Sequence, residues 1–196
     1  MDSIAVAADM VEANKGKDTL WRSSIAFGIN FSNLGLNNWS GGGQNAMSFV
    51  GVVVGSIAYD KDRIHWNNYL DIAYGFQRLG RKTAPFRKSD NRIYFQTKFA
   101  CEQTKKLRYA ALADFRTQFA EGYKYYDEVK PDSSVKISNI LAPAYLTASL
   151  GLEYLPFAST SIIFSPVAAK YTIVNDAELS AQGAYGVTPG TTLRKE

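Results

Sequence analysis

The sequence predicts an all-β fold, an antiparallel up-and-down β-barrel of the outer-membrane type. Three observations support this prediction: segments in which apolar and polar residues alternate, connections that are short and long in turn, and aromatic residues near both ends of the segments. No Pro/Gly/Ser-rich or charged linker divides the 196 residues into two domains. We expect an N-terminal extension over residues 1–20, barrel strands over 21–175, and a loop or the start of another strand over 176–196.

The first predicted strand begins at Trp21. Its apolar residues, Ile25, Phe27, Ile29 and Phe31, alternate with small or polar ones, which gives the strand one apolar and one polar face. The last predicted strand contains Pro166, which must bend it or place it at a sheet edge. About seven strands are expected in all, the other six lying over 46–60, 64–76, 92–99, 107–119, 144–154 and 159–174.

The connections between these segments alternate in length. Residues 59–63, 101–106 and 155–158 form short connections, whereas 34–45, 77–91 and 120–139 are long and polar or glycine-rich. Outer-membrane barrels have short periplasmic turns and long outer loops, so the N-terminus is predicted to be periplasmic. Bacterial barrels usually close with an even number of strands, so seven strands and a polar C-terminal end predict that the chain is truncated. The start shows no signal peptide, which an exported protein would need upstream.

Composition excludes several classes of function. The net charge of +4 is spread along the chain without a Lys/Arg block, which argues against nucleic-acid binding. No window of about 18 apolar residues predicts a transmembrane helix. The mean hydropathy of -0.19 is compatible with barrel strands. With one cysteine, Cys101, and one histidine, neither a disulfide nor a metal site is expected, and no cofactor is predicted.

The polar faces of the predicted strands carry many charges. Such residues would project into the barrel lumen, where they must pair or meet water. In a narrow barrel they would form an ion-pair plug, and in a wider one they would line a pore. The lumen-facing candidates are His65, Asp71, Arg92, Lys98, Arg108, Asp114, Arg116, Gln118 and Glu153.

Aromatic residues on the apolar faces cluster near the two predicted membrane interfaces, which indicates outer-membrane lipid as a partner. They are Trp21, Tyr59, Trp66, Tyr109 and Tyr154 near the periplasmic ends and Phe31, Tyr74, Phe76 and Phe119 near the outer ends.

Two of the long loops have a distinctive composition. The motif Asn38-Trp39-Ser40-Gly41-Gly42-Gly43 precedes a strand rather than a helix, which favours a tight loop with glycines at positive φ over a phosphate cradle. The loop with Arg81-Lys82 and Arg87-Lys88 is a candidate contact for lipopolysaccharide phosphates, and the long loops are candidate contacts for envelope proteins.

An ordered set of short motifs lies over about residues 21–171. The motifs are Asn38-Trp39-Ser40-Gly41-Gly42-Gly43, Trp66-Asn67-Asn68 with Asp71 and Tyr74-Gly75, Thr117-Gln118-Phe119 with Gly122-Tyr123, Ala142-Pro143-Ala144-Tyr145, Ser149-Leu150-Gly151 and Ser165-Pro166. This set resembles a Bacteroidota family known as a domain of unknown function, DUF3078. The resemblance implies an exported outer-membrane β-barrel-like protein with a signal peptide before this segment and more strands after it, without an assigned activity or catalytic residue.

The sequence favours a non-enzymatic protein of a Gram-negative outer membrane, either structural or part of an envelope assembly. A passive pore for small solutes is the first alternative, since the same charges would line a wide lumen. A lipid-active barrel hydrolase would need His65 beside Ser56 and Asp71. The last alternative is a soluble β-sandwich or calycin-like ligand binder whose second face packs on other residues.

Overall fold

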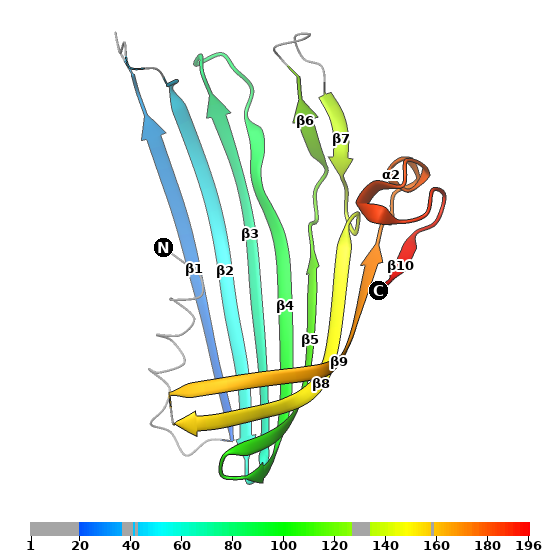
Figure 1. Cartoon of the computed structure of the whole chain (residues 1–196). Helices are drawn as coiled ribbons and strands as arrows, with labels where there is room; N and C mark the ends of the chain where they lie inside the picture. Colours follow the sequence, from blue (N-terminus) through cyan, green and yellow to red (C-terminus); the bar gives the residue numbers. More distant parts are fainter. Residues whose placement is uncertain (1–19, 37–40, 42, 127–133, 158) are drawn as a thin grey trace.

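The computed structural model describes residues 20–36, 41, 43–126, 134–157 and 159–196. Its main body is one antiparallel sheet of eight strands in the order β1-β2-β3-β4-β5-β8-β9-β10 (Figure 1). The prediction of an all-β antiparallel fold is confirmed. The bounds are β1 Trp21–Leu34, β2 Ala46–Lys61, β3 Ile64–Leu79, β4 Arg87–Thr104, β5 Leu107–Thr117, β8 Ala144–Phe157, β9 Thr160–Ile173 and β10 Leu193–Lys195.

Seven of these strands are long, and each pairs with the next long strand along the chain. The strands β2 and β3, β4 and β5, and β8 and β9 follow one another at one end of the sheet, called here the short-turn end. The strands β1 and β2, β3 and β4, and β5 and β8 follow one another at the other end, called the loop end (Figure 1). β5 ends at Thr117, so the strand predicted to reach residue 119 is two residues shorter.

Two regions contain structure that the sequence did not predict. The long connection after β5 forms a small hairpin of β6 (Gly122–Tyr125) and β7 (Ser134–Ser138). Residues 176–196, expected to be a loop or the start of a strand, form the short helix α2 (Ala177–Ala181), the 3-10 turn η1 (Ala184–Gly186) and β10, which pairs with β9. No helix among the described residues is both long and apolar enough to cross a membrane.

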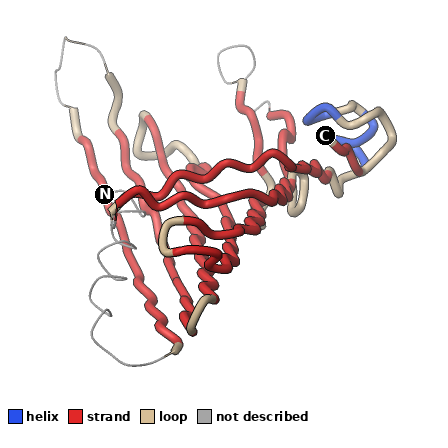
Figure 2. The backbone as a smooth tube through the Cα atoms, turned by 60° about the horizontal axis from the view of Figure 1, so that its bottom comes forward, coloured by secondary structure: helices blue, strands red, loops and turns tan. Residues whose placement is uncertain are grey.

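The sheet is curled but does not close into a barrel among the described residues. In the part of the chain that the structure describes, β1 pairs only with β2, and β10 pairs with Tyr171–Ile173 at the end of β9, with flanking backbone hydrogen bonds at Lys170 and Val174. The β8–β9 hairpin turns across the sheet toward the side where β1 lies (Figures 1 and 2).

The bend in this hairpin has a local cause. The pairing of β8 with β9 shifts register between Leu150 and Leu152, and a Cβ on Gly151 would collide with the carbonyl oxygen of Phe164. Only glycine allows this close approach, and a β-bulge bends the strand that carries it. Pro166 lies in the same bulge, which agrees with the bend predicted for it.

The two faces of the sheet differ in burial. The face that carries Ile25, Phe27, Ile29 and Phe31, called here the apolar face, is open: Phe27 is 74% exposed and Ile29 86%. The opposite, polar face carries the buried residues of the sheet centre, which are Val54, Asp71, Ala73, Ala100, Ala110 and Glu153. Among the residues that the structure describes, no second layer covers the polar face, and its burial comes from the curl of the sheet. The polar face therefore lies on the inside of the curled sheet, and the apolar face lies on the outside.

The C-terminal segment forms a separate small core at the loop end. Ala142, Val174, Leu179 and Val187 are buried together. Asp176 caps α2 by accepting hydrogen bonds from the backbone N–H groups of Glu178 and Leu179. We call this unit, residues 174–187, the C-terminal cap.

Candidate functional site

A row of charged side chains crosses the polar face near the short-turn end. On β1, Arg22 forms an ion pair with Asp60 of β2. His65 of β3 lies between two carboxylates: its Nδ1 is 2.5 Å from Asp60 Oδ1, and its Nε2 is 2.8 Å from Glu102 Oε1 of β4. Each link joins neighbouring strands of the sheet.

The row continues through β5, β8 and β9. Arg108 Nη2 donates to Glu102 Oε1 at 2.6 Å, and Arg108 Nη1 lies 4.0 Å from Glu153 Oε2. Lys98 Nζ and Ser161 Oγ, the latter at 2.5 Å, both donate to Glu153 Oε1. We call this row the charged belt, consisting of Arg22, Asp60, His65, Lys98, Glu102, Arg108 and Glu153.

Strand register explains how residues so far apart in sequence form one row. Asp60 is paired with His65, Glu102 with Arg108, and Arg108 with Glu153. Side chains of paired residues project from the same face of a sheet and approach within about 5 Å at Cβ. The alternation of each strand therefore brings all of them to the polar face.

Glu153 is the buried centre of the belt. It is 2% exposed, and its Oε2 accepts no hydrogen bond among the described residues. A buried carboxylate is costly unless it is paired with cations. Lys98 and Arg108 supply this pairing, so the belt is required for burial of Glu153.

His65 does not lie beside the serine and the carboxylate that the hydrolase alternative requires. Its two ring nitrogens face Asp60 and Glu102, one carboxylate each. Ser56 Oγ is hydrogen-bonded to Ser24 Oγ at 2.7 Å, and Asp71 pairs with Arg92 at 3.3 Å. The structure therefore does not bring His65, Ser56 and Asp71 together as the hydrolase alternative requires.

The other predicted lumen residues form two smaller groups further toward the loop end. Asp71 is 6% exposed and pairs with Arg92, which also donates to Asp90 at 2.9 Å. Arg116 lies 3.3 Å from Asp114, and its guanidinium lies over the Tyr94 ring at 4.9 Å.

Eight of the nine predicted lumen residues thus share the polar face, and Gln118 is the exception. It follows β5, where its Nε2 donates to the carbonyl oxygen of Ala142 at 3.1 Å. Among the residues that the structure describes, no group of three or more His, Cys, Asp or Glu side chains could hold a metal ion.

Aromatic side chains gather at both ends of the apolar face. At the short-turn end, the Trp21 ring lies 4.7 Å from Tyr59 and 6.2 Å from Trp66 between centroids. At the loop end, Phe49, which the sequence analysis did not select, links Phe31 at 4.8 Å to Phe76 at 5.4 Å. The remaining predicted aromatics, which are all exposed, are Tyr74, Tyr109, Phe119 and Tyr154. The rings of Tyr74 and Phe119 pack together, with 5.3 Å between their centroids.

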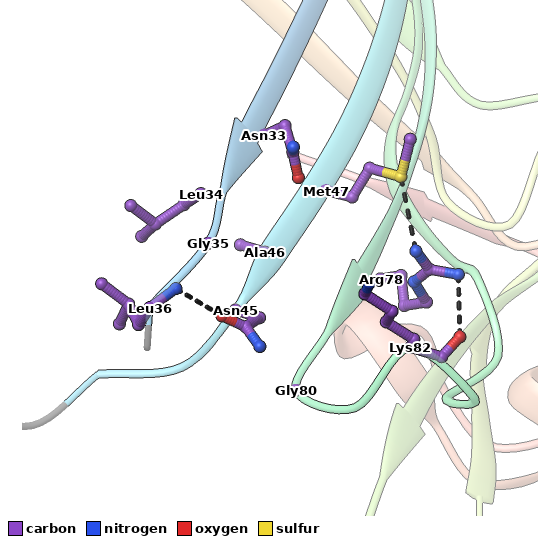
Figure 3. A pocket seen from close by; sticks show the side chains of 10 residues that line it. All are labelled: Asn33, Leu34, Gly35, Leu36, Asn45, Ala46, Met47, Arg78, Gly80 and Lys82. Atoms are coloured by element: carbon purple, nitrogen blue, oxygen red, sulfur yellow. Dashed lines mark hydrogen bonds between the residues drawn. The ribbon is translucent and has the colours of Figure 1, made fainter. Parts of the chain in front are cut away.

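A pocket of about 350 Å³ opens at the loop end between the β1–β2 and β3–β4 connections (Figure 3). We call it the loop-end pocket. Its charged side chains, Arg78 and Lys82, lie across from Leu36 and Asn45 (Figure 3). The lining residues are Asn33, Leu34, Gly35, Leu36, Asn45, Ala46, Met47, Arg78, Gly80 and Lys82.

The sequence analysis did not select Arg78, Asn33 or Asn45. A signal for them exists in the strand register, which pairs Asn33 with Met47 and Met47 with Arg78. This row lies two residues beyond the paired Phe31, Phe49 and Phe76 and shares their face.

The glycine-rich motif borders this pocket only in part. Asn38, Trp39, Ser40 and Gly42 lie outside the described residues. Gly43 has a φ of 102°, which agrees with a loop that needs glycine at positive φ. A Cβ there would lie 3.1 Å from Leu36 Cδ1 in the pocket wall.

Comparison with known proteins adds a family but not an activity. Nothing among curated proteins and nothing among solved structures matches the chain. Residues 31–123 match the model of a family described as "Protein of unknown function (DUF3078)". This match includes β2 to β5 and most of the charged belt. These residues thus match the DUF3078 model, as the resemblance of the motifs predicted.

Proposed function

We propose that this chain forms part of the wall of a β-barrel in the outer membrane of a Gram-negative bacterium, with a structural rather than enzymatic role. Its apolar face would contact lipid, and its polar face would pack the barrel interior. The observation that carries the proposal is the inverted burial of the sheet: large apolar side chains are exposed, while Asp71 and Glu153 are buried.

Physical reasons favour lipid over water on the apolar face. Monomeric soluble proteins rarely expose a continuous apolar patch larger than a few hundred Å². Here exposed apolar side chains recur on every long strand from β1 to β9. Aromatic clusters at both ends of this face resemble the two interfacial girdles of membrane barrels.

The charged belt supports a structural role for the polar face. Its ion pairs and hydrogen bonds join all seven long strands, and each belt residue contacts at least one other. Such a network holds neighbouring strands in register and satisfies charges away from bulk water. In lipid the edges of β1 and β9 would also need backbone partners.

The first experiment combines membrane fractionation with face-specific labelling. In cells that produce the whole protein, we expect it in the outer-membrane fraction with a heat-dependent gel shift. In a Cys101→Ala background, a fluorophore at Val53→Cys on the apolar face should be quenched by spin-labelled lipid. The matched position Val52→Cys lies on the polar face and should not be quenched. A periplasmic protein, or equal quenching at both positions, would refute the proposal.

A passive pore is the second candidate, and the exposure of Arg116 favours it. The side chain of Arg116 is 64% exposed on the polar face, unlike the charges of the belt. In a closed barrel it would face water in the lumen. Arg116→Gln should then change the ion selectivity of single channels, whereas a plugged barrel would show no steady conductance with either residue.

A further inference from the structure

We infer that the loop-end pocket binds the phosphate group of a membrane-lipid headgroup. This inference rests on the proposed function, because it requires lipid beside the apolar face. It assigns a ligand class to Arg78, Lys82 and Asn45, none of which takes part in the charged belt.

The pocket presents hydrogen-bond donors of the kind that recognise phosphate. Arg78 Nη1 donates to the carbonyl oxygen of Lys82 at 2.9 Å and Nη2 to the Met47 sulfur at 3.5 Å, while its Cζ lies 4.9 Å from the centre of the Phe86 ring. These contacts hold the guanidinium in place but use only two of its five N–H groups. A positioned guanidinium loses less side-chain entropy when it binds an anion.

Asn45 and Lys82 add further donors. The Oδ1 of Asn45 accepts from the backbone N–H of Leu36 at 2.6 Å, which leaves its amide NH₂ as the free group. Among the described residues, no carboxylate forms an ion pair with Arg78 or Lys82. The pocket therefore combines two cations and an amide donor, which suits a phosphate through charge-assisted hydrogen bonds.

The surrounding sequence has a uniform charge sign. The two stretches of sequence around the lining residues, 33–48 and 76–89, contain five cations and neither Asp nor Glu. The potential near the pocket is therefore positive, which attracts an anion. The five cations are Arg78, Arg81, Lys82, Arg87 and Lys88.

The position of the pocket selects a lipid headgroup over a free anion. Arg78 lies on the apolar face, two residues beyond the row of Phe31, Phe49 and Phe76. Aromatic girdles mark the level of the membrane interface, so a cation just beyond one lies at the depth of lipid phosphates. Acyl chains of the same lipid would lie against the three phenylalanine rings.

The test uses two lipids that differ only in the phosphate. The protein is reconstituted in phosphatidylcholine vesicles containing either dioleoyl phosphatidic acid or dioleoylglycerol, then extracted in detergent. Mass spectrometry counts the lipid retained per chain. We expect preferential retention of phosphatidic acid, reduced roughly tenfold in affinity by Arg78→Gln and less by Lys82→Gln. Arg81→Gln removes the same charge from the same loop but does not line the pocket, so it should change retention less than about twofold.

The outcomes separate this inference from the function on which it rests. Equal retention of both lipids by an embedded protein, or equal losses from Arg78→Gln and Arg81→Gln, would overturn the pocket while leaving the barrel wall intact. Displacement of phosphatidic acid by millimolar inorganic phosphate would indicate a free-anion site and also overturn it. A protein that does not enter either vesicle would overturn both proposals. Circular dichroism of each variant distinguishes lost binding from misfolding.

Discussion

The two ends of the sheet differ in whether their cations are paired with carboxylates. At the short-turn end, the cations Arg22, Lys98 and Arg108 pair with carboxylates on the polar face. At the loop end, Arg78 and Lys82 line a pocket and pair with no carboxylate among the described residues. The cations of the first arrangement have carboxylate partners within the chain, whereas those of the second have none among the residues that the structure describes.

This difference indicates that the charges at the short-turn end contribute to the stability of the fold and those at the loop end to ligand binding. A charge whose partner lies within the chain contributes to the fold, and its loss should destabilise the protein. A cation positioned without a counter-ion contributes little to stability and is suited to an external anion. The comparison therefore predicts that equal changes of charge at the two ends will have unequal effects.

The largest effect is expected at Glu153. Glu153→Gln removes the only carboxylate that Lys98 contacts among the described residues, and it leaves two partly buried cations, Lys98 and Arg108, with less negative charge beside them. Breaking a buried ion pair costs about 3 to 5 kcal/mol, and since Lys98 is partly exposed we expect about 2 to 3 kcal/mol. The midpoint of urea unfolding of the purified protein measures this loss.

The matched control for this change is Glu178→Gln. Glu178 pairs with Lys136 at 3.0 Å, but its side chain is exposed, so the expected loss is within about 0.5 kcal/mol. Equal losses from the two variants would show that the belt does not stabilise the sheet.

A pair of arginine variants compares the two ends directly. Arg108→Gln removes the hydrogen bond to Glu102 and the charge near Glu153, and we expect a loss of about 1 kcal/mol because Arg108 is partly exposed. Arg78→Gln removes no ion pair among the described residues and should cost less than about 0.5 kcal/mol. Urea unfolding of both variants under one condition tests the ranking. A larger loss from Arg78→Gln would contradict the assignment of this residue to recognition.

The belt could be predicted from the sequence only in part. Alternation placed His65, Arg108 and Glu153 on one face, because a strand has a period of two residues. Alternation does not give the register between strands. The register places His65 beside Asp60 and Glu102 rather than beside Ser56 and Asp71. The partners of each charge therefore required the structure.

The loop-end pocket was missed for a related reason. The sequence analysis selected Arg81-Lys82 as part of a cationic loop. It placed Arg78 near the start of the connection predicted over 77–91 and therefore did not assign it to a strand face. In the structure β3 continues to Leu79, so Arg78 follows Phe76 on the same face. The C-terminal cap gave no periodic signal, since its core is formed by single residues such as Val174 and Leu179 from irregular segments.

The last effect is confined to the C-terminal cap, where the loop end does contain a paired carboxylate. Asp176 accepts hydrogen bonds from Lys136 Nζ at 2.9 Å, Asn139 Nδ2 at 2.8 Å and the backbone N–H of Leu179 at 3.1 Å. Together these donors, Lys136 first, hold the pKa of Asp176 well below its usual range, and the same pair raises the pKa of Lys136. The folded form thus binds the Asp176 proton more weakly than the unfolded form.

The sign of the pH effect follows from this lowered pKa. The stabilisation by Asp176 is present above its unfolded pKa of about 4 and is lost as the pH falls below that value toward the folded pKa. Amide hydrogen exchange in residues 177–182 should therefore accelerate on acidification, while exchange in β3 and β4 changes less. In Asp176→Asn, exchange of the cap should already be faster at neutral pH and should lose this acid dependence. An unchanged acid dependence in the variant would assign the effect to another carboxylate, and the paired charge at the loop end would then contribute nothing to the cap.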